Sequence, residues 1–102
     1  MLIDGIFFSH GGASDIPGRK VTQSRGIIKA HGRHKRTSGV GNIKACNFAR
    51  ADAYKQLAEQ AIAMGANAVL NVQINPFVMR YSDSTYWEAP ISGDAVTLGD
   101  ED

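Results

Sequence analysis

The sequence contains a single cysteine, Cys46, and this scarcity excludes two kinds of site. One thiol cannot form an intrachain disulfide, and it cannot supply the several cysteines of a Cys-rich zinc site. Long apolar runs are also missing, since no stretch approaches the roughly 18 apolar residues that a membrane-spanning helix needs. The first residues, MLIDGIFFSHGG, lack the basic start of a secretory signal. We therefore expect a cytoplasmic protein with no membrane partner.

The chain is too short for a second domain. It has 102 residues, of which 43% are hydrophobic and 21% charged, which is ordinary for a folded globular protein. We therefore treat residues 1–102 as a single domain, and the composition argues against a disordered chain.

Acidic residues are absent from residues 19–50, although the net charge of the whole chain is only +1. This segment carries a charge of +9, the 18 residues before it carry −2, and the 52 residues after it carry −6. Two interpretations stay open. The basic segment contacts phosphate groups, or it meets the acidic half of the same chain or of a neighbouring subunit.

The strongest secondary-structure signal is a helix over residues 48–64. Its apolar residues, mostly alanines, share one broad arc and its charged residues share the other, which is typical of a helix lying on a sheet. Asn47 is predicted to cap its start, and Gly65 is predicted to end it in a left-handed conformation.

Strands are predicted on both sides of this helix, and they make the fold α+β, with one helix packed on an antiparallel or mixed sheet. Gly26 interrupts the second strand and predicts a bulge there. Residues 31–42, HGRHKRTSGVGN, are predicted to form a loop. The predicted strands cover residues 2–8, 20–30, 66–75, 77–81, 85–88 and 94–98.

In the strand over residues 66–75, apolar side chains alternate with amides. If the apolar set packs on the helix, the amides lie on the opposite face of the sheet, where they are either solvated or buried between subunits. An amide both donates and accepts hydrogen bonds, so copies from neighbouring subunits can satisfy one another. The predicted apolar set is Ala68, Leu70, Val72 and Ile74, and the predicted oligomer or lumen face is Asn67, Asn71, Gln73 and Asn75.

The run FARADAYKQLAEQAIAMGANAVLNVQI, together with a final strand like GDAVTL, resembles the YbjQ-like family, whose label is a heavy-metal-binding domain. MGANAV is the most specific part of this resemblance. The resemblance implies a dodecin-like α+β subunit that assembles with itself into a ring, commonly a homopentamer. It carries over no catalytic residues.

A metal site, if the family label applies, has few ligands to draw on. The candidate ligands for a divalent metal ion are Cys46, His31 and His34, and a ring is able to pool them from several subunits. The alternatives are a pair of solvated histidines and a small buried thiol beside the helix start.

Arg33, Lys35 and Arg36 are the candidate anion-binding residues, and phosphate or nucleic-acid binding is the alternative function. The basic segment has no aromatic residue before Phe48, so the sequence gives no support for base stacking. Gly39-Val40-Gly41 lacks the lysine and hydroxyl residue of a P-loop.

The sequence has no serine elbow, no Cys–His signature and no carboxylate pair at a motif spacing, so we expect a non-enzymatic protein. Tyr81, Tyr86 and Trp87 form an aromatic stretch that we interpret as a contact with a neighbouring subunit.

Overall fold

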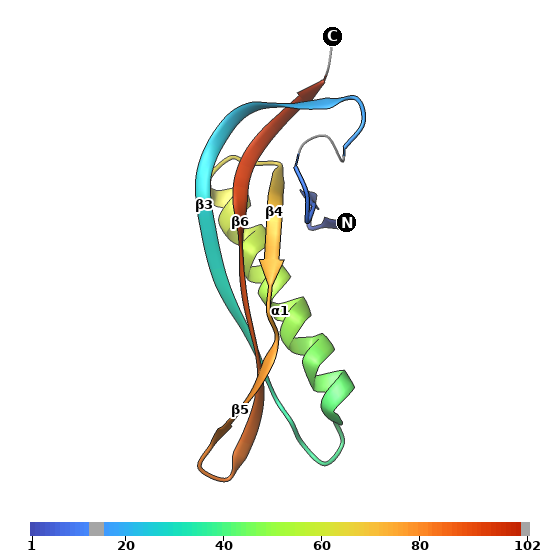
Figure 1. The fold of residues 1–102 in the computed structure, drawn as a ribbon, viewed down its shortest axis with the longest axis vertical. Helices are drawn as coiled ribbons and strands as arrows, with labels where there is room; N and C mark the ends of the chain where they lie inside the picture. The colour runs from blue at the N-terminus through green and yellow to red at the C-terminus, as the bar shows by residue number, and fades with distance from the viewer. Residues whose placement is uncertain (13–15, 101–102) are drawn as a thin grey trace.

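Six strands form one mixed sheet, and a long helix, α1, covers one face of it (Figure 1). The computed structural model describes residues 1–12 and 16–100. The strands follow the order β1-β2-β4-β6-β3, and β5 also pairs with β6. This arrangement confirms the predicted α+β fold. The elements are β1 (Leu2–Ile3), β2 (Ile6–Phe8), β3 (Arg19–Lys35), α1 (Asn42–Ala63), β4 (Ala68–Ile74), β5 (Phe77–Tyr81) and β6 (Ser84–Asp100).

The strands β3 and β6 run along the long axis of the molecule, which measures 56 × 21 × 18 Å (Figure 1). Each has 17 residues, and they pair antiparallel from Arg19 opposite Asp100 to Lys35 opposite Tyr86. The predicted loop at residues 31–42 is therefore wrong over its first five residues, which continue β3. The two strands predicted at residues 85–88 and 94–98 are one strand, because β3 pairs with β6 across the gap between them.

The predicted bulge at Gly26 is confirmed. The register of β3 against β6 shifts between Ser24 and Gly26, and the φ angle of Gly26 is 104°. A residue with a Cβ rarely adopts such an angle, so glycine is suited to this position.

The helix begins at Asn42, six residues before the predicted start at Phe48. Gly41 occupies the N-cap position, so the predicted cap Asn47 lies inside the helix, and Cys46 also lies in α1 rather than before it. The predicted end is confirmed, since Gly65 follows α1 with a φ angle of 76°. Across residues 1–12 and 16–100, no helix is both long and apolar enough to cross a membrane.

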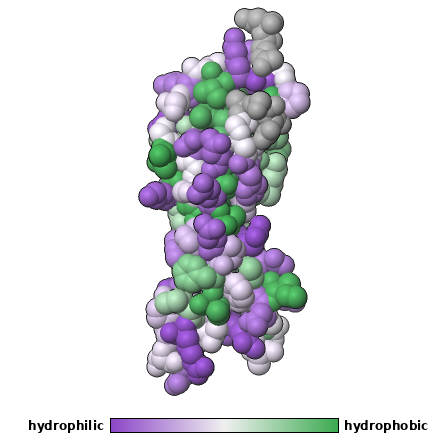
Figure 2. All heavy atoms as spheres, viewed as in Figure 1, coloured by the Kyte–Doolittle hydropathy of each residue, from purple (hydrophilic) through white to green (hydrophobic). Residues whose placement is uncertain are grey.

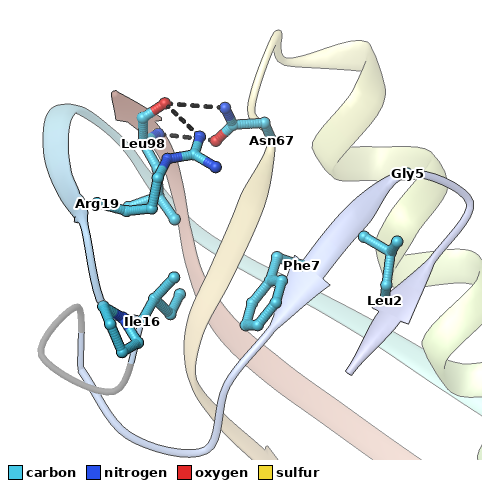
Figure 3. Close-up of a pocket in the computed structure, with 8 residues that line it drawn as sticks. Leu2, Gly5, Phe7, Ile16, Arg19, Asn67 and Leu98 are labelled. Carbon is cyan, nitrogen blue, oxygen red and sulfur yellow. Dashed lines mark hydrogen bonds between the residues drawn. The ribbon is translucent and has the colours of Figure 1, made fainter. Parts of the chain in front are cut away.

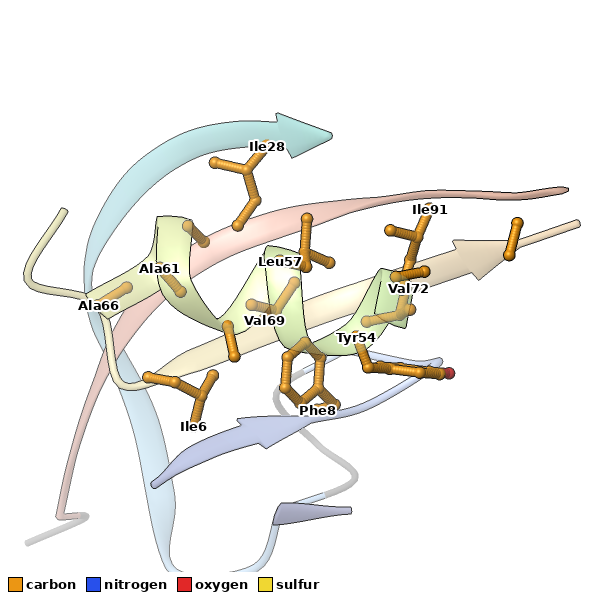
Figure 4. Packing of buried hydrophobic residues seen from close by; sticks show 14 of the residues in the cluster. Ile6, Phe8, Ile28, Tyr54, Leu57, Ala61, Ala66, Val69, Val72 and Ile91 are labelled. Carbon is orange, nitrogen blue, oxygen red and sulfur yellow. The ribbon is translucent and has the colours of Figure 1, made fainter. Parts of the chain in front are cut away.

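Small side chains let α1 lie close to the sheet. Ala49 and Ala53 are fully buried against β3, where a Cβ added to Gly32 would clash with the backbone of both turns. Leu57 is fully buried further along α1, and the ring of Tyr54 packs edge-on against Phe8 at 5.3 Å (Figure 4). On the helix side this core is thus mostly alanine, with Tyr54 and Leu57, and on the strand side it is mostly branched or aromatic.

The strand β4 changes which side chains face the helix partway along its length. Between Leu70 and Gln73 its register against β6 gains one extra residue, and Asn71 there has a φ angle of 53°. This bulge reverses the alternation. Val72 and Ile74 pack on the helix side as predicted, but Ala68 and Leu70 do not, since they join a second cluster with Ile16, Val96 and Leu98. Val69 faces the helix in their place.

Candidate functional site

The face of the sheet turned away from α1, here called the outer face, carries most of the residues that the sequence singled out. Ala89 and Ile91 of β6 pack under the helix, so the alternate residues Glu88, Pro90 and Ser92 lie on the outer face. In Figure 2 hydrophilic side chains gather over the middle of the molecule, where β4 lies in front of α1, and hydrophobic ones lie above and below.

Glu88 is the most deeply buried charged residue described, with 1% of its surface exposed. Its two carboxylate oxygens accept hydrogen bonds from the Arg33 guanidinium at 2.7 to 3.0 Å. The His31 ring nitrogen Nε2 lies 2.9 Å from Oε2, and the Tyr81 hydroxyl donates to Oε1 at 3.2 Å. The Arg33 guanidinium also lies about 5 Å from the ring centres of Tyr81 and Tyr86. We call these five residues the Glu88 cluster.

The Glu88 cluster explains a large pKa shift. The hydrogen bonds from Arg33 lower the pKa of Glu88 to about 2, although burial acts in the opposite direction. The same pairing raises the pKa of Arg33. Because Glu88 comes from β6, Arg33 from β3 and Tyr81 from β5, the cluster ties the β5 hairpin to the long strands. Its hydrogen bonds join residues of three strands, so it holds these strands together.

The predicted anion-binding residues are only partly free for that role. Arg33 is engaged by Glu88, which supports the interpretation that the basic segment meets the acidic half of the same chain. Lys35 is exposed opposite Tyr86, and Arg36 follows β3, where its backbone N–H donates to Thr85. Glu88 was not singled out from the sequence. A signal was present, because Glu88 is an acid in a predicted strand and a basic strand precedes the helix, which together indicate an ion pair.

The three predicted metal ligands lie in different surroundings. His31 contacts Glu88, the ring of His34 lies 4.7 Å from that of Phe48, and Cys46 lines a groove of about 220 Å³ beside Trp87. Within residues 1–12 and 16–100, no three His, Cys, Asp or Glu side chains gather to hold a metal ion. A single described chain therefore does not fit a heavy-metal site, and the role of these three residues as ligands stays a prediction.

The four predicted amides have four different environments. Asn67 exchanges two hydrogen bonds with the backbone of Leu98, at 2.7 and 3.0 Å. Asn71 donates to the Asp94 carboxylate at 2.9 Å. Gln73 and Asn75 alternate with the helix-facing Val72 and Ile74, so they point to the outer face as predicted. Whether any of the four lies between subunits stays a prediction.

A groove of about 430 Å³ lies between the N-terminal strands and the start of β3 (Figure 3). Leu2, Phe7 and Ile16 give it apolar walls. Its polar residues are already engaged, because Arg19 and Asn67 both donate to the Leu98 carbonyl at 3.0 Å. A ligand in this groove would contact mainly apolar surface, because the polar side chains already use hydrogen-bond donors on the Leu98 carbonyl.

Comparison with known proteins places the chain in a family but assigns it no reaction. A crystal structure from Pediococcus pentosaceus, of a protein with unknown function in the DUF74 family, has a similar fold with a TM-score of 0.67. The two chains are 14% identical, and the match covers 93% of this chain and 99% of that one. No match was found among curated proteins. The model of the YbjQ family, described as "Putative heavy-metal-binding", matches residues 41–99, more than half of the sequence. This chain therefore belongs to the YbjQ family, as its resemblance predicted.

Proposed function

We propose that this protein is a non-enzymatic, self-assembling ring, and that its subunits form a homopentamer as the family resemblance implies. The observation that carries the proposal is β5. All five of its residues are exposed, and four of them are large apolar side chains: Phe77, Val78, Met79 and Tyr81. A contiguous apolar strand left in water is a typical mark of a protein–protein contact.

The apolar residues of β5 lie on both faces of its hairpin. Phe77, Met79 and Tyr81 share the outer face with Glu88, and Val78 lies on the other face, opposite Trp87. The hairpin stands at one end of the molecule (Figure 1). Burial of such side chains contributes about 25 cal/mol per Å² of apolar surface, so a neighbouring subunit is a favourable partner for both faces.

Unpaired strand edges support the same conclusion. In the described part of the chain, β3 pairs only with β6, and so does β5. One edge of the 17-residue β3 therefore has no strand partner, and proteins commonly cover such an edge by assembly or protect it with charge. Side chains of α1 cover part of this edge, because Asp52 accepts a hydrogen bond from the backbone N–H of Arg33, and Gln56 and Gln60 donate to the carbonyls of His31 and Lys29. The basic side chains of β3 protect its edge by charge, whereas β5 carries one charge, Arg80.

Native mass spectrometry and light scattering of the untagged protein test the proposal. The expected result is a particle of five times 11.0 kDa. The paired substitution Val78→Ser and Met79→Ser should dissociate it into folded monomers, with unchanged helix content by circular dichroism.

Ile62→Ser is the matched control, because Ile62 is an exposed apolar residue of α1 far along the chain from β5. It should leave the assembly intact. A wild-type protein that stays monomeric at tens of micromolar would overturn the proposed ring. Equal dissociation by both variants would show that β5 is not the contact.

Metal binding is a separate part of this proposal, and the family's description is its only support. We propose that any metal taken up is held between subunits, by Cys46, His31 or His34 of more than one copy. Metal content of the purified oligomer, measured by inductively coupled plasma mass spectrometry, tests this. A stoichiometric metal in the monomeric β5 variant would contradict it.

A further inference from the structure

One row of polar side chains crosses the outer face between the Glu88 cluster and the β4 bulge. In register, Lys29 of β3 lies opposite Ser92 of β6, and Ser92 lies opposite Gln73 of β4. Directly opposite residues on neighbouring strands have Cβ atoms about 5 Å apart, so the side chains of Lys29, Ser92 and Gln73 begin next to one another on this face. Asn75 joins them two residues beyond Gln73.

These side chains line a groove of about 240 Å³, here called the Ser92 groove. Ala30, Pro90 and Ile91 complete its lining. Ser92, Gln73 and Asn75 provide the hydrogen-bonding groups of the groove.

The rows on either side of the Ser92 groove are satisfied internally. On one side, Asp94 accepts a hydrogen bond from Asn71 at 2.9 Å. On the other side, Glu88 is held by Arg33 and His31. The acids next to the groove are thus engaged by other residues.

By contrast, the groove's own polar side chains are unused. Among the residues that the structure describes, no ion pair engages the Lys29 ammonium, and no side-chain hydrogen bond engages Ser92, Gln73 or Asn75. The carbonyl of Lys29 does accept a bond from Gln60, at 2.7 Å, which fixes the backbone of β3 at this row. A cation with three adjacent uncharged donors, on three paired strands, is suited to an anion.

We propose that the Ser92 groove binds a small oxyanion, a carboxylate or phosphate group. The Lys29 ammonium supplies the charge, the Ser92 hydroxyl donates one hydrogen bond, and the amide groups of Gln73 and Asn75 donate the others. This site goes beyond the proposed assembly, because all of its groups come from one chain. It also differs from the anion site predicted at Arg33, Lys35 and Arg36.

Titrations followed by transverse-relaxation-optimised NMR of the ¹⁵N-labelled, intact protein test the site. Sodium phosphate and sodium acetate are the two probes, each at constant ionic strength set with sodium chloride. Saturable shifts of the Gln73 and Asn75 side-chain amides and of the Ser92 backbone amide are the expected result. The probe with the lower Kd identifies which oxyanion the groove prefers.

Lys29→Met should raise this Kd by at least about tenfold, since it removes the charged donor. Lys55→Met removes an exposed lysine from α1 and should leave the Kd unchanged. Gln73→Ala provides a second, uncharged test and should also weaken binding. If neither probe gives saturable shifts, the proposal is overturned. It is also overturned if Lys29→Met and Lys55→Met change the Kd equally. Native mass spectra of the same samples report the ring separately, so failure of this site and failure of the assembly are distinguishable.

Discussion

The Glu88 cluster makes a prediction about stability and pH that can be worked from the structure. Folding lowers the pKa of Glu88 from 4.5 to about 2. Because each pKa unit corresponds to 1.36 kcal/mol, ionised Glu88 contributes on the order of 3 kcal/mol to the free energy of unfolding at neutral pH.

The sign of the pH dependence follows from the direction of the shift. The pKa is lower in the folded state, so the contribution is fully present above the unfolded value of 4.5. It is lost as the pH falls from about 5 toward 2, when the folded carboxylate is protonated too.

Glu88→Gln is the direct perturbation, since it keeps the shape of the Glu88 side chain but removes its negative charge, which Arg33 and His31 contact. Removing one partner of a buried ion pair costs about 3 to 5 kcal/mol. Half of the side-chain surface of Arg33 and of His31 is exposed, so water compensates part of this loss. We therefore expect a loss of about 3 kcal/mol at pH 7, the lower end of that range.

The assay is urea unfolding of wild type and variant at one protein concentration, at pH 7, 5, 3 and 2. The gap between the two free energies of unfolding should be about 3 kcal/mol at pH 7 and should close by about pH 2. Glu59→Gln, on the exposed side of α1, is the control and should show little gap at any pH. A gap for Glu88→Gln that stays constant with pH, or no gap at pH 7, would refute the electrostatic account.

Three further predictions concern packing, and thermal or urea unfolding measures each of them. Gly32→Ala should destabilise the protein by more than about 2 kcal/mol because its Cβ meets the helix backbone, whereas Gly39→Ala, with open space around it, should be nearly neutral; equal effects would contradict the close approach. Leu57→Ala should cost about 2 to 5 kcal/mol, since Leu57 is fully buried, and a smaller loss would mean that the helix shifts to fill the cavity. Asn71→Gly should be tolerated at the positive φ of the β4 bulge, whereas Asn71→Val should destabilise; the reverse order would show that the bulge is absent.

The family and the fold class were accessible from sequence because they depend on local signals. The alanine arc of α1, the left-handed Gly65 and the interrupted strand at Gly26 are properties of short segments, and the structure confirms each of them. The start of the helix was not accessible. The chain turns back at residues 37–40, where Thr37 and Val40 form a bridge, and Gly41 then caps a helix that begins earlier than its apolar pattern does.

Only the tertiary structure decided which residues form a site. The sequence by itself determined that basic residues precede the helix and that acids follow it, and that amides alternate in the strand after Gly65. Pairing of β3 with β6 brought Arg33 to Glu88 and placed Lys29 beside Ser92. One extra residue near Asn71 reversed the faces of β4. The physical reason is that strand register and bulges are set by partners far away in the chain, and a shift of one residue moves every side chain to the other face.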